Sequence, residues 1–95
     1  EALIKQTRAT ATSYTDALQS IQADLKDGPC KSAQAAYLKL EQQELGLIND
    51  MLDALAAGDG AGAKAAAQTY RTLTASAESQ AIDQTYLKAC GLSSV

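Results

Sequence analysis

The apolar residues of segment 32–57 recur at the three- and four-residue spacings of an α-helix. Wound into a helix, they would cover about half of its circumference. An apolar arc this wide needs a neighbouring helix on each side. We therefore predict a helix over residues 31–57 that forms the centre of a bundle. Its apolar residues are Tyr37, Leu38, Leu40, Leu45, Leu47, Ile48, Met51, Leu52 and Leu55.

The preceding segment, 2–26, carries a seven-residue repeat, which is typical of a helix packed through one narrow face. One line of the repeat is Ile4, Ala11, Leu18 and Leu25, and the interleaved line is Thr7, Tyr14 and Ile21. Polar residues such as Arg8 fall largely outside this face. Gly28 and Pro29 should end the helix, since Gly favours a left-handed cap and Pro cannot continue a helix.

A third helix is predicted over residues 61–89, after a glycine-containing connection in which Asp59 is the expected N-cap. Its apolar face is followed by a separate ridge of Ile82, Tyr86 and Cys90, so the helix either rotates its buried face or bends near Asp83. Short connections between helices of similar length favour antiparallel neighbours. The expected fold is all-α, an antiparallel up-down-up three-helix bundle in a single domain, 1–95.

The two cysteines lie at positions that this topology brings together. Cys30 is at the start of the second helix and Cys90 at the end of the third. In an up-down-up bundle these two helix termini lie at the same end of the bundle. We predict a disulfide between them and, with it, an oxidising compartment. The alternative is two buried free thiols in a cytosolic protein.

Composition and charge exclude several classes of function. The net charge is −3 and is spread along the chain, so the concentrated basic face of a nucleic-acid-binding protein is missing. The sequence has no histidine, which excludes Ser-His-Asp and Cys-His catalysis. We predict a non-enzymatic protein with no metal centre and no cofactor. No apolar run approaches the length of a membrane span.

Glu41 and Glu44 are the most unusual residues by position, because both fall within the apolar arc of segment 31–57. An isolated carboxylate there would be costly. Matching levels along antiparallel helices places them near Tyr14 of the first helix and near Tyr70, Thr74 and Glu78 of the third. One interpretation is a polar layer whose long side chains reach water. The other is a ligand or ion site in the middle of the bundle, formed by Glu41, Glu44, Tyr14 and Tyr70.

A second apolar cluster lies off the main stripe of segment 61–89. It consists of Ile82, Tyr86 and Leu87, with Leu92 and Val95 beyond them. Folded over the disulfide end, this cluster would close the core. Left exposed, it would form a dimer or partner surface.

The alanine-rich texture, the hairpin AAGDGAGAKAA and the terminal LKACG resemble small exported or lipid-anchored helical-bundle proteins of high-GC Gram-positive bacteria. The resemblance implies a secreted or cell-envelope location. Because the chain begins at Glu1, within a helical pattern, we expect that a signal peptide or lipid anchor was removed. We predict a binding module with a protein partner at the envelope and membrane attachment only through that anchor. The alternative is a ligand- or ion-sensing domain with its site at Glu41 and Glu44.

Overall fold

The computed structural model describes residues 2–92 of the 95-residue chain. In this part of the chain the fold is all-α, as predicted. Its helices are α1 (Ala2–Asp24), α2 (Pro29–Ala56), α3 (Gly60–Ala75) and α4 (Ala77–Ala89). Val95, the last residue of the predicted C-terminal cluster, lies outside the described residues.

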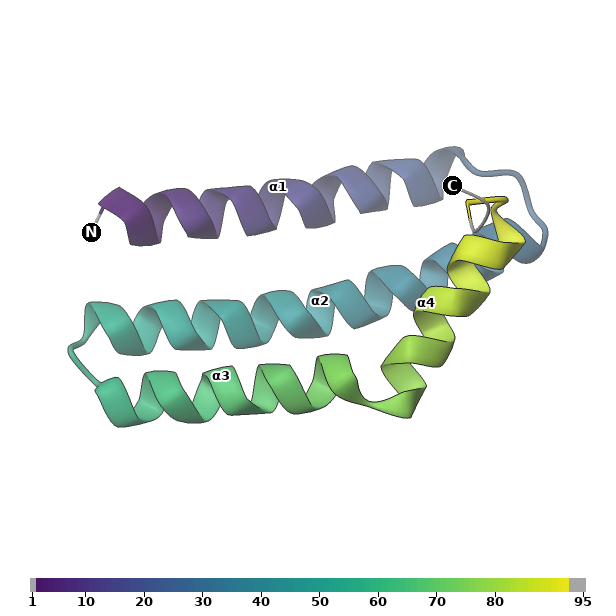
Figure 1. Ribbon diagram of the computed structural model, residues 1–95. Coiled ribbons are helices and arrows are strands. Elements are labelled where there is room, and N and C mark those ends of the chain that lie inside the picture. Colours follow the sequence, from purple (N-terminus) through teal and green to yellow (C-terminus); the bar gives the residue numbers. More distant parts are fainter. Residues whose placement is uncertain (1, 93–95) are drawn as a thin grey trace.

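The longest helix, α2, is the centre of the molecule (Figure 1). It contacts α1, α3 and α4, whereas α1 contacts only α2 among the four helices of the described residues. In Figure 1, α1 and α3 run along opposite sides of α2. The prediction that segment 31–57 needs two neighbours is therefore confirmed, but α1 and α3 do not close the bundle against each other.

The helix ends follow local chemistry. Pro29 occupies the first turn of α2, where its missing N–H has no intrahelical partner to lose. Gly58 follows the C-cap of α2 with φ 74°, a left-handed conformation that glycine adopts without strain. The Asp59 side chain then caps α3 by accepting a hydrogen bond of 2.9 Å from the Gly62 N–H. The predicted N-cap at Asp59 is confirmed.

The third predicted helix is wrong as a single element, because it is broken at Ser76 into α3 and α4. The Leu73 carbonyl accepts hydrogen bonds from the hydroxyls of Ser76, at 2.7 Å, and Ser79, at 2.6 Å. The Ser76 Oγ in turn accepts from the Ser79 N–H at 3.1 Å and caps α4. These side-chain bonds replace helical backbone bonds, so the bend lies at Ser76 and not near Asp83.

The rotation of α1 also differs from the prediction. The line Ile4, Ala11, Leu18 and Leu25 is at least half-buried, as expected. The second buried line is Arg8, Thr15 and Gln22, whereas Thr7, Tyr14 and Ile21 are exposed. Arg8 contacts α2 through its guanidinium, which lies 2.8 Å from the Asp53 carboxylate and donates to the Asn49 Oδ1 at 3.1 Å. Since α1 has one neighbour, these polar contacts help to set which side of it faces α2.

The predicted disulfide is present between Cys30 and Cys90, whose Cα atoms lie 4.7 Å apart. It joins the start of α2 to the residue that follows α4. The bend at Ser76 carries α4 across the start of α2 (Figure 1), and the rings of Tyr37 and Tyr86 stack there with centroids 4.4 Å apart. The disulfide and this aromatic pair both hold α4 on α2.

The core is thin and built from small or aliphatic side chains. Its buried apolar residues are Leu18, Ala33, Leu40, Leu52 and Ala63. Gln34 is completely buried beside them and donates from Nε2 to the Leu18 carbonyl at 3.0 Å, while its Oε1 has no partner among the described residues. Across residues 2–92, no helix combines the length and hydrophobicity needed to cross a membrane.

Candidate functional site

The gap between α1 and α3 leaves a groove whose floor is α2; we call it the α1/α3 groove. Its larger part has a volume of about 440 Å³ and is almost entirely apolar. Its smaller part, the acidic pocket, has a volume of about 70 Å³. Ile48 and Tyr70 line both parts, so the two are neighbours. The larger part is formed by Thr7 of α1, Leu47, Ile48 and Met51 of α2, and Ala66, Ala67, Tyr70 and Arg71 of α3.

The acidic pocket brings together the four residues that the sequence analysis placed in one site. Glu41 and Glu44 come from α2, Tyr14 from α1 and Tyr70 from α3. Both glutamates are half-buried, one helical turn apart on the same face of α2. The antiparallel packing of α1 and α3 on α2 supplies one tyrosine from each side. This proximity agrees with the level matching, although it does not by itself identify a ligand.

All four tyrosines of the chain form one connected cluster at this level. The hydroxyls of Tyr14 and Tyr37 are hydrogen-bonded at 2.8 Å, and Tyr37 stacks on Tyr86 of α4. Tyr70 lines the pocket with Tyr14. Tyr14 and Tyr70, the two tyrosines that the sequence analysis anticipated, line the pocket of the carboxylates. Tyr37 and Tyr86 extend the cluster from Tyr14 toward α4.

The electrostatics of the pocket are those of crowded carboxylates. Burial, followed by the charge of Glu44, raises the pKa of Glu41 to about 7. Burial and the charge of Asp83, which α4 brings near, also raise the pKa of Glu44. Burial raises the pKa of Tyr37 and of Tyr70, with nearby glutamates adding to the effect. With a pKa of about 7, Glu41 is partly protonated at neutral pH, so the pocket carries less negative charge than two free carboxylates would.

The described residues offer no cluster of three or more histidine, cysteine or carboxylate groups placed to hold a metal ion. A pair of carboxylates under a tyrosine cluster can instead accept hydrogen bonds from a cationic donor. The aromatic faces around it attract organic cations through their quadrupoles.

Ile82, Tyr86 and Leu87, the predicted alternative surface, are half-buried on α4. Tyr86 stacks on Tyr37 of α2, which favours the interpretation that this cluster closes the core. Large apolar side chains are exposed on α1, where Leu3 is 73% exposed, Tyr14 48% and Ile21 46%, and at Leu55 near the end of α2, which is 48% exposed. The sequence analysis missed this stripe because it assigned Tyr14 and Ile21 to the buried face.

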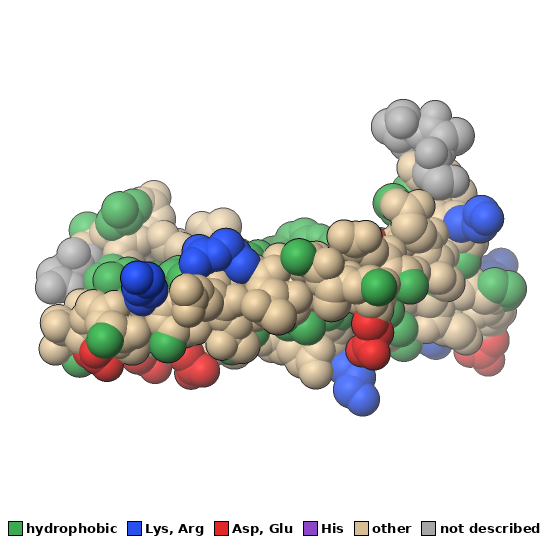
Figure 2. All heavy atoms as spheres, turned by 60° about the horizontal axis from the view of Figure 1, so that its bottom comes forward, with side chains coloured by type: hydrophobic (Ala, Val, Ile, Leu, Met, Phe, Trp, Pro, Cys, Tyr) green, Lys and Arg blue, Asp and Glu red, His purple; other side chains and the backbone are tan. Residues whose placement is uncertain are grey.

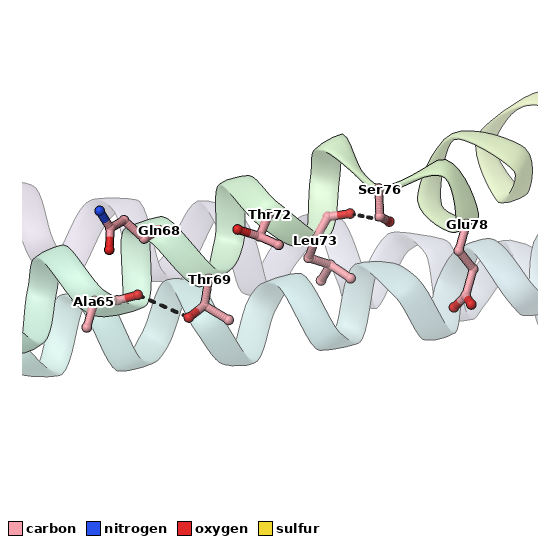
Figure 3. Close-up of a pocket in the computed structure, with 7 residues that line it drawn as sticks. All are labelled: Ala65, Gln68, Thr69, Thr72, Leu73, Ser76 and Glu78. Atoms are coloured by element: carbon pink, nitrogen blue, oxygen red, sulfur yellow. Dashed lines mark hydrogen bonds between the residues drawn. The ribbon is translucent and has the colours of Figure 1, made fainter.

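A second hollow, of about 690 Å³, lies along α3 and the bend (Figure 3). It is lined by Ala65, Gln68, Thr69, Thr72, Leu73, Ser76 and Glu78, all from α3 and the α3–α4 junction. Two of its hydroxyls are already engaged with the Ala65 and Leu73 carbonyls, as the dashed lines in Figure 3 mark. The side chains that form this hollow come from α3 and the start of α4, whereas α1, α2 and α3 all contribute to the α1/α3 groove.

The face seen in Figure 2 carries its Lys and Arg side chains as separate positions and no continuous basic patch. This agrees with the even charge distribution of the sequence. Comparison of the chain with protein-family models, with curated proteins and with solved structures finds no match.

Proposed function

We propose that this chain is a non-enzymatic binding module and that its ligand occupies the α1/α3 groove. The observation that carries the proposal is that an apolar groove of about 440 Å³ borders the pocket of Glu41 and Glu44, with Ile48 and Tyr70 lining both. Small-molecule sites commonly have volumes of roughly 300–1,000 Å³, with apolar walls and a few convergent polar groups. The α1/α3 groove has this composition.

The module is proposed to work outside the cytoplasm, secreted or at the cell envelope. The Cys30–Cys90 disulfide is consistent with an oxidising compartment. The resemblance of the sequence to exported or lipid-anchored bundle proteins supports the same location.

The exposed stripe of Leu3, Tyr14 and Ile21 favours a second candidate, a protein partner at the envelope. The three residues lie on one side of α1, next to its buried face. A partner helix laid over this stripe and the groove would cover apolar surface that α1 leaves open. The ligand and the partner would then compete for the same groove.

The test is a titration of the isotope-labelled protein with 1-octanol, a neutral apolar probe, followed by two-dimensional NMR. Saturable shifts at the amides of Ile48, Met51 and Ala67 are expected, because these residues line the groove. Ala66→Leu should weaken binding by filling the groove, while the adjacent Ala65→Leu adds the same side chain to the outer face of α3 and should leave binding intact. Shifts that do not saturate, or that ignore Ala66→Leu, would contradict the proposal.

A further inference from the structure

We infer that the acidic pocket binds the ammonium group of a linear alkylammonium ligand, whose hydrocarbon chain lies in the apolar part of the α1/α3 groove. The inference rests on the proposed function, since it names the ligand class of the same groove. It combines three features: the carboxylates of Glu41 and Glu44, the side chains of Tyr14 and Tyr70, and the adjoining apolar part of the α1/α3 groove.

The charge of the pocket selects a cation. Glu41 and Glu44 line it, and Asp83 of α4 is near enough to affect the ionisation of both. The residues that line the acidic pocket include no Lys or Arg. Arg8 pairs with Asp53, and Arg71 lines the larger part of the groove. A bound ammonium would supply the missing positive charge and donate to both glutamates.

The size and the walls of the pocket select an organic ammonium with a slender head. About 70 Å³ holds a primary ammonium and its first methylene groups but no bulky head. The rings of Tyr14 and Tyr70 line the same pocket, and aromatic faces stabilise alkylammonium groups through cation–π attraction. A hydrated metal ion would gain nothing from these rings.

The larger part of the α1/α3 groove determines the remaining part of the ligand, its hydrocarbon chain. Ile48 and Tyr70 lie at the border between the pocket and the larger part, and Leu47 and Met51 line the floor of the larger part. An alkyl chain attached to the ammonium passes directly between these walls. Burial of that chain adds hydrophobic free energy to the charge contacts of the head.

The pH dependence of binding gives an independent signature of the ammonium head group of the ligand. A cation beside Glu41 favours the ionised carboxylate, so binding should release protons and strengthen as pH rises through about 7. The groups that face Glu41 come from all four helices, and their charges act on the same equilibrium: Tyr14 of α1, Tyr37 and Glu44 of α2, Tyr70 of α3 and Asp83 of α4.

The experiment compares three probes of equal chain length by calorimetry on the oxidised protein: n-octylammonium, 1-octanol and octanoate. Octylammonium should bind about tenfold or more tightly than octanol, since a hydrogen bond to a charged group contributes about that factor. Octanoate should bind most weakly. Glu44→Gln should remove the preference for octylammonium, whereas Glu78→Gln, which changes an exposed glutamate on α4, should keep it.

The outcomes separate the two proposals. Equal binding of all three probes, or an octylammonium preference that survives Glu44→Gln, would overturn the ammonium inference while the groove remains a binding site. Failure of every probe to bind would overturn the proposed function and the inference with it. A Tyr70→Leu variant that lowers octylammonium affinity more than octanol affinity would support the aromatic contribution, and an equal loss for both would contradict it.

Discussion

Replacing both cysteines with alanine should remove a large share of the stability of this fold. The disulfide joins residues separated by 60 positions. For a loop of that length the chain-entropy relation gives a stabilisation of ~4 kcal/mol, because the cross-link restricts the unfolded chain. A domain of this size is stable by roughly 5–14 kcal/mol in total. The double variant should therefore lose between about a third and most of its folding free energy.

The structure offers few contacts to compensate for this loss. Five apolar residues are buried within residues 2–92, and two of them are alanines, so the core gives a modest hydrophobic contribution. α4 contacts α2 and α3 but not α1 within the described residues. Without the disulfide, its contacts with α2 include the stacked pair of Tyr37 and Tyr86. We expect α4 to open locally before the rest of the molecule unfolds.

The assay is urea denaturation followed by circular dichroism, with free energies obtained by linear extrapolation. Cys30→Ala, Cys90→Ala and the double variant should be destabilised by similar amounts, since each removes the same cross-link. Hydrogen exchange on the double variant should show the loss of protection concentrated in Ala77–Ala89. A double variant within about 1 kcal/mol of the oxidised protein would refute the reasoning, as would equal loss of protection in all four helices.

Three further predictions concern single polar residues. Because the folded pKa of Glu41, about 7, exceeds its ordinary value of 4.5, the folded state holds a proton that the unfolded state has released, and stability should fall as pH rises between these values. Glu41→Gln should flatten this decline in thermal melts from pH 4.5 to 8, and an unchanged pH profile would contradict the assignment. Ser79→Ala should cost about 1 kcal/mol in urea unfolding, since it removes a buried hydroxyl bonded to the Leu73 carbonyl; Ser13→Ala, at an exposed position on α1, is the control and should cost little. Gln34→Met should be more stable than Gln34→Ala, because both variants remove the amide and its bond to the Leu18 carbonyl but only Met fills the buried space; an alanine variant as stable as the methionine variant would contradict this packing argument.

The sequence by itself determined the helical class, most helix ends and the pairing of the cysteines. Glycine and proline act locally at Gly58 and Pro29, so their effects can be read without the rest of the chain. The apolar arc of segment 31–57 specified the central helix, because its width requires two neighbours. The approach of Tyr14 and Tyr70 to Glu41 and Glu44 also followed from antiparallel order and length alone.

Only the tertiary structure decided the bend at Ser76, the rotation of α1 and the groove. The hydroxyls of Ser76 and Ser79 can satisfy either a straight helix or a break, and the break is the arrangement in which α4 crosses α2 with Cys90 beside Cys30. A seven-residue repeat leaves two possible second lines on α1, and contacts such as Arg8 with Asp53 distinguish them. The groove exists because α1 and α3 both pack on α2 and not on each other, a relation between distant segments that no local pattern encodes.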